Sequence, residues 1–192
     1  MDQQILDKAK KIKLLILDVD GVMTDGRIYY GNYGDEIKAF NVKDGFGLAL
    51  LRRAGIEVAI VTAKKSRIAK LRAKDIGIKW IYENSSKLKV FNKLLRKFRI
   101  DAQEACFVGD DLIDIPVLKS VGLPVTVPQA VNEVKTISSY VTRAGAGSGA
   151  VREICEIILK SQGRWEEVTK KYTDGHRCHC EEAEGRRPKG VP

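Results

Sequence analysis

Two aspartates that directly follow an apolar run give the sequence its clearest chemical signal. Residues 14–17 are all apolar, and they lead into Asp18-Val19-Asp20-Gly21. An apolar run of this length, bounded by turn residues, is typical of a buried parallel strand. Side chains two apart in an extended chain point the same way, so the two carboxylates should lie close together and repel one another. A divalent cation would balance their charge; the alternative is a strand followed by an ordinary Asp-Gly turn.

Further polar side chains follow other strand-like runs. Thr62 comes directly after the second run, and Asp110 and Asp111 follow the fourth run after Gly109. Lys87 opens the helix that follows the third run. Parallel strands bring their carboxyl ends to one edge of a sheet, where open α/β sheets bind ligands. Carboxylates, a hydroxyl and an ammonium in one crevice fit phosphoryl transfer assisted by Mg²⁺, which prefers hard oxygen ligands.

The elements that must position these residues alternate along the chain. The expected strands cover residues 14–17, 57–61, 79–82, 105–108, 123–127 and 140–142, and the expected helices cover 3–10, 44–54, 66–76, 86–98, 113–121, 131–137 and 150–160. This alternation predicts an α/β fold: a doubly wound, Rossmann-like parallel sheet with helices on both faces. Residues 27–40 interrupt the rhythm and predict a protruding β-hairpin. Asp44 is the expected N-cap of the helix that follows the hairpin.

The size and composition are those of an ordinary globular protein. The chain has 192 residues, 44% of them hydrophobic and 31% charged. We expect one domain over residues 1–172 and a flexible tail over 173–192. No apolar run reaches the roughly 20 residues of a membrane span, and the N-terminus has no secretory signal, so we expect a cytoplasmic protein without a membrane partner.

The net charge of +9 suggests an anionic partner. The basic residues are scattered rather than gathered with aromatic residues in one tract, which favours a small anionic ligand over nucleic acid. Cys106 and Cys155 lie in apolar patterns and read as core thiols. The stretch 176–180 holds two histidines and two cysteines, too tightly spaced for all to reach one tetrahedral ion. We therefore favour a tail over a structural zinc site.

Taken in order, these motifs resemble the four motifs of the haloacid dehalogenase superfamily. The superfamily phrases are LDVDGVMTDG, then Thr62, then Lys87, then VGDDLIDIPV. From about residue 10 to 160 the chain is most similar to the branch of phosphatases that act on 3-deoxy-D-manno-octulosonate 8-phosphate (KDO 8-phosphate). The additional phrases are GNYGDEIKAF, NVKDGFG, SKLKVFNKLL and GSGAVREICE.

The resemblance implies a Mg²⁺-dependent phosphoric monoester hydrolase. Its implied reaction is hydrolysis of KDO 8-phosphate through an aspartyl-phosphate, in lipopolysaccharide precursor biosynthesis. Phosphatases of nine-carbon, sialic-acid-type sugar acid phosphates share these phrases and remain the alternative. A non-catalytic module that binds anions is a third and weaker hypothesis.

The resemblance also implies a role for each matching position. Asp18 becomes the nucleophile and a metal ligand, and Asp20 the general acid/base, which binds metal through its backbone carbonyl. Asp110 becomes the second metal carboxylate. Thr62 and Lys87 would hold the phosphate. Asp111 and Asp114 would support the site. The implied substrate-binding residues are Asp20, Asn41, Val42, Lys43, Asp44, Gly45, Lys64, Arg72 and Lys87.

The chain departs from the branch in two places. Ala63-Lys64 stands where the branch usually has Gly-Arg. Lysine keeps the positive charge but lacks the bidentate fork that suits a carboxylate, so the identity of the sugar acid is less certain than the chemistry. The tail of the branch is short, contains glycine and reaches a neighbouring active site, which residues 176–192 do not resemble.

Little sequence is left over for a domain that covers the site. Only about 36 residues separate Asp25 from Thr62, and these already contain the hairpin, a helix and a strand. The exposed tyrosines expected on the hairpin, Tyr29, Tyr30 and Tyr33, favour pairing between subunits. We therefore expect a homo-oligomer in which one subunit completes its neighbour's site, and the resemblance implies a tetramer. The glycine-rich stretch 145–149 could bind phosphate, but we favour a role in subunit packing or in starting the last helix.

Overall fold

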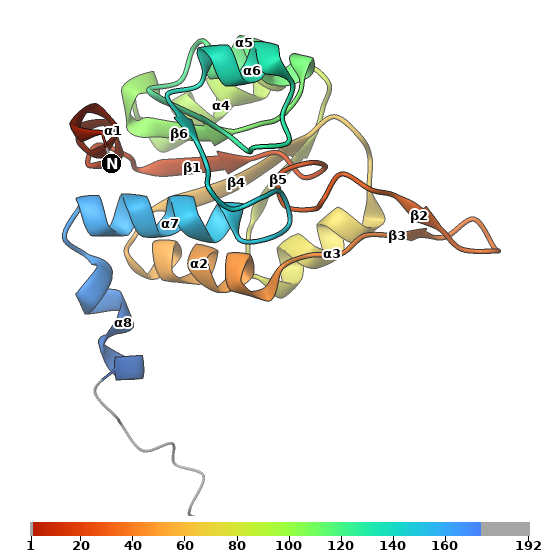
Figure 1. Cartoon of the computed structure of the whole chain (residues 1–192), viewed down its shortest axis with the longest axis horizontal. Helices are drawn as coiled ribbons and strands as arrows, with labels where there is room; N and C mark the ends of the chain where they lie inside the picture. Colours follow the sequence, from red (N-terminus) through yellow and green to blue (C-terminus); the bar gives the residue numbers. More distant parts are fainter. Residues whose placement is uncertain (1, 174–192) are drawn as a thin grey trace, which may run out of the picture.

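Six parallel strands form the sheet at the centre of the structure, a computed structural model that describes residues 2–173. They run in the order β5-β4-β1-β6-β7-β8 across the sheet (Figure 1). Their bounds are β1 (Leu14–Leu17), β4 (Glu57–Thr62), β5 (Trp80–Glu83), β6 (Ala105–Val108), β7 (Leu123–Thr126) and β8 (Tyr140–Val141). Chain order therefore runs outward from β1 on one side and then outward from β6 on the other. This confirms the predicted doubly wound sheet and places its ligand crevice at the carboxyl ends of β1 and β6.

Side chains of β1 alternate between the two faces of the sheet. Leu15 and Leu17 pack in one hydrophobic cluster, whereas Leu14 and Ile16 pack in the other. All four are fully buried, which explains why this strand is an unbroken apolar run. One face carries α1 (Gln3–Ala9), α2 (Val42–Arg53), α3 (Arg67–Asp75) and α7 (Ala150–Ser161), and the other carries α4 (Lys87–Phe98), α5 (Ile115–Leu118) and α6 (Asn132–Ile137) (Figure 1).

Helix α2 begins earlier than the sequence predicted. Its N-cap is Asn41, whose side chain accepts hydrogen bonds from the backbone N–H groups of Lys43 and Asp44. The expected cap, Asp44, lies inside the first turn and is buried. Its carboxylate accepts a 2.7 Å hydrogen bond from the backbone N–H of Arg152 in α7. Asp44 therefore joins two helices instead of capping one.

The other predicted helices and strands lie within about three residues of their expected bounds. The helix expected around residues 113–121 is divided into a 3-10 turn (Leu112–Asp114) and α5. Pro116 lies in the first turn of α5, where its missing N–H breaks no helical hydrogen bond. A 3-10 turn (Ala102–Glu104) and α8 (Trp165–Thr173) were not predicted.

The predicted hairpin is formed by β2 (Tyr29–Tyr30) and β3 (Glu36–Ile37), which pair antiparallel. It projects away from the sheet beyond the helices (Figure 1). Tyr33 at its tip is 99% exposed. Between β1 and β4 the described chain contains this hairpin and α2 and no inserted cap domain, as predicted.

Other predictions concern the end of the chain. Thr173, expected to begin the tail, is the last residue of α8. The rest of the expected tail, with its histidine and cysteine cluster at 176–180, lies outside the described residues. Among residues 2–173, no helix combines the length and the apolar character needed to cross a membrane.

Candidate active site

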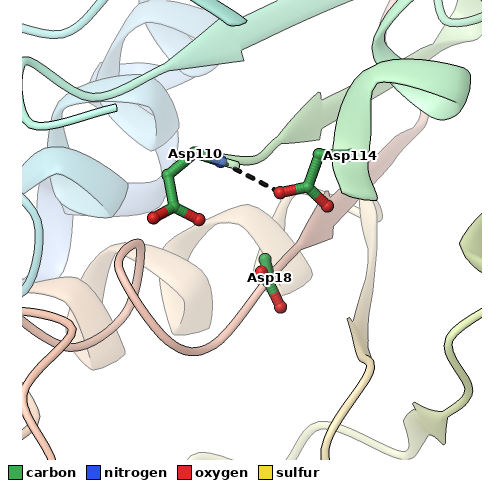
Figure 2. A group of neighbouring side chains, drawn as sticks. All are labelled: Asp18, Asp110 and Asp114. Carbon is green, nitrogen blue, oxygen red and sulfur yellow. Dashed lines mark hydrogen bonds between the residues drawn. The ribbon is translucent and has the colours of Figure 1, made fainter. Parts of the chain in front are cut away.

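Asp18 and Asp110 meet at the switch point of the sheet. Asp18 directly follows β1, and its backbone N–H still donates to the carbonyl of Val108 at the end of β6. Asp110 lies two residues beyond Val108. Figure 2 shows these two carboxylates beside that of Asp114, and one oxygen of each lies within 4.8 Å of the others.

Lys87 is the cation inside this cluster. It opens α4, and its side chain is almost completely buried. Its Nζ lies 2.8 Å from Asp18 Oδ2 and 2.6 Å from Asp114 Oδ1. One buried ammonium therefore holds the carboxylates of two different strand-end loops, and it fixes the carboxylate of Asp18.

Asp114 is a brace rather than an open ligand. It is fully buried, and its Oδ2 accepts hydrogen bonds from the backbone N–H groups of Asp110 and Asp111, at 3.0 Å and 3.3 Å. Its other oxygen, Oδ1, accepts a hydrogen bond from the ammonium of Lys87. Asp114 does not line the cavity between the strand ends, whereas Asp18 and Asp110 do, so these two are the carboxylates placed to bind a cation. Asp111 caps the 3-10 turn, because its side chain accepts from the backbone N–H of Leu112.

The electrostatics of the cluster favour a bound cation. Burial raises the pKa of Asp18 to about 6, against the opposing charge of Lys87. Burial, followed by the charges of Asp18 and Asp114, raises the pKa of Asp110 to about 7. Burial opposes the charge on Lys87, but the same two carboxylates raise its pKa overall. Three carboxylates facing one ammonium leave an excess of negative charge that a divalent cation would balance.

The backbone beside the cluster also fits a small, hard cation. A Cβ on Gly21 would lie 1.9 Å from Asp110 Oδ2, so only glycine lets this carboxylate come so close to the turn after Asp18. Oxygen ligands from two carboxylates, with room for water and phosphate, are the donor set that Mg²⁺ prefers. The residues present therefore fit the predicted metal.

Asp20 has a different partner from the one expected. Its carboxylate is not part of the acidic cluster, because the chain turns after Asp18: the N–H groups of residues 22–24 all donate to the carbonyl of Val19. Asp20 Oδ1 instead accepts from the ammonium of Lys38. Lys38 also lies 3.2 Å from Glu36, which in turn lies 3.1 Å from Lys64. The expectation that both carboxylates face one cation was therefore wrong for the side chain of Asp20.

The strand ends enclose a cavity of about 270 Å³. Seven of the fourteen predicted site residues line it: Asp18, Asp20, Thr62, Lys64, Lys87, Asp110 and Asp111. The other lining residues are Gly21, Gly26, Ala63 and Ile113. Lys38, which contacts Asp20, was not predicted as a site residue because it is one lysine among many in the chain. The signal was its place two residues after Glu36 in a predicted strand, which puts both side chains on one face.

The remaining predicted substrate residues do not line this cavity. Val42 is 80% exposed, and Lys43 is also at the surface. Arg72 donates from Nη2 to the carbonyl of Asn41 at 3.1 Å, and its guanidinium lies over the ring of Phe40. In the single chain, Arg72 therefore holds the start of α2 in place.

Comparison with known proteins agrees with this geometry. The sequence model of the haloacid dehalogenase-like hydrolases matches residues 59–154. The chain is 47% identical over 165 residues to the 3-deoxy-D-manno-octulosonate 8-phosphate phosphatase KdsC of Escherichia coli K12, covering 85% of this chain and 88% of that protein.

Two solved structures extend the comparison. The Moraxella catarrhalis phosphatase in complex with magnesium, phosphate and KDO superposes with a TM-score of 0.87 at 38% identity, covering 90% of this chain and 99% of that one. The cobalt-bound phosphatase of Haemophilus influenzae superposes with a TM-score of 0.78 at 36% identity, covering 81% of this chain and 92% of that one. The chain thus belongs to the 3-deoxy-D-manno-octulosonate 8-phosphate phosphatase family of haloacid dehalogenase-like hydrolases.

Proposed function

We propose that this protein is a Mg²⁺-dependent phosphomonoesterase that hydrolyses KDO 8-phosphate to KDO and inorganic phosphate. The observation that carries the proposal is the meeting of Asp18 and Asp110 around Lys87 in a strand-end cavity. The E. coli relative, 47% identical to this chain over 165 residues, carries the name of this activity. The step is expected to belong to lipopolysaccharide precursor biosynthesis in the cytoplasm.

The metal site uses Asp18, Asp110 and the backbone carbonyl of Asp20. Bound there, Mg²⁺ balances the charge of the phosphate and of the attacking carboxylate. Asp114 and Asp111 support this site from behind, because the first holds the loop of Asp110 and the second caps the turn that follows it.

The chain's own groups account for both halves of the reaction. In the first, Asp18 attacks phosphorus while the bond from phosphorus to the ester oxygen breaks, and Asp20 gives its proton to the departing alkoxide. In the second, Asp20 takes a proton from water, whose oxygen attacks phosphorus and displaces the carboxylate of Asp18. The free sugar acid and phosphate leave, and both aspartates return to their starting states.

Phosphate binding is assigned to Thr62 and Lys87. Both line the cavity beside Asp18, and both are buried. A hydroxyl donor and an ammonium hold the oxygens of the transferred phosphate while charge redistributes around phosphorus. Lys87 thus positions the nucleophile and the group that it attacks.

Recognition of the sugar acid is assigned to the rim of the cavity. Lys64 is the exposed cation there, and we assign it to the substrate carboxylate. Residues 41–45 and Arg72 lie outside the cavity of the single chain. We propose that they serve the substrate in an assembled oligomer, a tetramer in which the aromatic hairpin of one subunit covers the site of another. Residues 1–172 are proposed to form one domain.

The test is phosphate release from a panel of sugar phosphates by the full-length protein. The panel contains KDO 8-phosphate, a nine-carbon sialic-acid-type phosphate and sugar phosphates without a carboxylate, each with magnesium and with a chelator. We expect the highest kcat/KM for KDO 8-phosphate and no turnover with the chelator.

Lys64 is the reason to keep the nine-carbon alternative in the panel, because it stands where the branch usually has arginine. Preference for the nine-carbon phosphate would transfer the assignment to that substrate. Turnover of no phosphate at all would overturn the catalytic reading and favour a module that only binds anions.

A further inference from the structure

Lys38 is a buried cation that the reaction described above does not use. Its side chain is 0% exposed, although it stands directly after β3 of the projecting hairpin. Neighbouring hairpin side chains are in solvent: Tyr30 is 70% and Ile37 is 54% exposed. Lysine is among the residues least often buried, because its ammonium loses hydration and its long chain loses rotamer freedom. A specific contact must offset those costs.

That contact is with Asp20. The ammonium of Lys38 donates to Asp20 Oδ1 and lies 3.2 Å from Glu36 Oε1. Among the described residues, Lys38 is the hydrogen-bond partner of the Asp20 side chain, and Asp20 Oδ2 has none. One oxygen of Asp20 is therefore anchored, while the other is left open in the wall of the cavity.

A line of alternating charges extends this anchor. It runs from Asp20 to Lys38, then to Glu36, then to Lys64 at the rim. Glu36 and Lys38 are two residues apart in the hairpin, so their side chains lie on one face and reach Lys64 and Asp20, while Ile37 between them faces solvent. The base of the hairpin is thereby fixed to the group that must exchange a proton with the substrate.

We propose that Lys38 is a positioning residue for Asp20, held in place by Glu36. The inference rests on the proposed function, in which Asp20 protonates the leaving alkoxide. By fixing Oδ1, Lys38 directs Oδ2 toward the ester oxygen. A general acid contributes only when its proton lies within hydrogen-bond reach of the leaving group, and such contributions are typically about 10²–10⁴-fold.

The test compares leaving groups that need a proton with ones that do not. Lys38→Met keeps the length of the side chain and removes the ammonium. KDO 8-phosphate leaves as an alkoxide, whereas p-nitrophenyl phosphate and acetyl phosphate release anions that are stable without a proton. For Lys38→Met we expect kcat/KM to fall about 100-fold with KDO 8-phosphate and less than about fivefold with the other two compounds.

Two further variants keep the test decisive if Lys38→Met fails to fold, as judged by circular dichroism and thermal unfolding. Lys38→Arg keeps a donor and should recover part of the lost activity toward KDO 8-phosphate. Glu36→Gln removes the second anchor and should give a smaller loss with the same dependence on leaving group. Lys119→Met, at an exposed position outside the cavity, is the matched control and should equal the wild type.

Two outcomes would overturn the inference. An equal loss with all three compounds would mean that Lys38 serves phosphate binding or folding, and no loss would mean that Asp20 needs no anchor. If the wild type fails to hydrolyse KDO 8-phosphate, the proposed function fails instead. A sugar phosphate of the panel that the wild type does hydrolyse, which also leaves as an alkoxide, then replaces KDO 8-phosphate in the comparison with p-nitrophenyl phosphate and acetyl phosphate.

Discussion

The aspartates of the site carry the same chemical group and differ in the residues that contact it. Asp114 has both oxygens engaged, by Lys87 and by two backbone N–H groups. Asp20 has one oxygen engaged, by Lys38. The carboxylate of Asp110 accepts no hydrogen bond within the described residues, and the residue is held by its backbone, which donates to Asp114 and accepts from the N–H of Val131. These differences support the proposed roles of Asp114 as a brace, Asp20 as the proton carrier and Asp110 as a metal ligand.

Asp110 should make the stability of the metal-free protein depend on pH. Burial raises its pKa from the ordinary 3.8 to about 7. Between these values the folded protein keeps a proton that the unfolded chain has lost, so the free energy of unfolding falls as the pH rises through this window. Asp110→Asn removes the titrating group. With a chelator present, we expect its melting temperature relative to wild type to increase from about pH 4 to about pH 7 and then level off.

Magnesium should raise the melting temperature of the wild type relative to that of Asp110→Asn. At about pH 7 and above, a saturating concentration should stabilise the wild type and leave Asp110→Asn nearly unchanged, because only the wild type keeps both carboxylates. A difference in melting temperature that does not vary with pH would contradict the burial of Asp110. Equal stabilisation of both proteins would contradict its role as a ligand.

The sequence was sufficient to bring Asp18, Thr62, Lys87 and Asp110 together. Each ends a strand, follows one or opens a helix, so the parallel topology alone places them at one edge. The rotation of Asp20 toward Lys38 could not be predicted, since it depends on the turn after Asp18 and on where the hairpin folds back. The exclusion of Arg72 from the cavity likewise depends on the packing of α3 against α2.

The glycine-rich loop before α7, residues 145–149, supports the turn that follows Asp20. The backbone N–H of Gly147 donates to the carbonyl of Val22 at 3.0 Å. Gly147 has φ of +60°, and a Cβ there would lie 2.7 Å from the backbone nitrogen of Asp25. The stretch thus packs against its own chain and leads into α7, the helix start that we favoured over phosphate binding; its expected part in subunit packing stays a prediction.

Gly147→Ala should therefore disturb the site from a distance. Its Cβ would collide with backbone atoms of Thr24 and Asp25 and would also strain φ, so we expect a loss of about 2–4 kcal/mol of unfolding free energy and a lower kcat/KM. Gly163→Ala is the matched control, because Gly163 has φ of +66° but no atom within 4 Å of its Cβ position. It should cost only about 1 kcal/mol and leave activity unchanged. Equal costs in urea unfolding would argue against the collision.

The elements themselves were largely readable from the pattern of apolar residues and turn signals. The start of α2 was not, because Asn41 and Asp44 are both good caps and only the contact of Asp44 with Arg152 distinguishes them. Helix α8 was also missed. Val168 is its one buried residue, and its aromatic residues pair with cations of α2 and α7, as Tyr172 does with Arg53 and Trp165 with Arg152.

In the whole molecule, the cavity and the hairpin are both uncovered, and one neighbouring subunit could cover both. No cap domain covers the cavity within the described chain, and the hairpin exposes Tyr29, Tyr30 and Tyr33. A second copy of the chain would bury these rings and exclude water from the site. Tetramer formation and the completion of each site by a neighbour remain proposals that rest on this surface.

Charged substitutions on the hairpin test that assembly. We expect Tyr30→Asp combined with Tyr33→Asp to reduce the mass measured by light scattering from four times the 21.4 kDa of one chain to a smaller oligomer. Phosphatase activity should fall with it. Val141→Asp places the same charge on another exposed apolar residue, in β8, and should leave the mass unchanged. A wild type that is already monomeric would refute the proposed assembly.

Asp18 is proposed to attack the phosphate of KDO 8-phosphate at a site that holds magnesium. The most direct measurement of this attack is the initial rate of phosphate release from KDO 8-phosphate by wild type and Asp18→Asn, each with saturating magnesium. The amide cannot form the covalent intermediate, so we expect the rate to fall by at least about 10³-fold, while the melting temperature confirms a folded variant. A folded Asp18→Asn protein that releases phosphate at the wild-type rate would contradict the account.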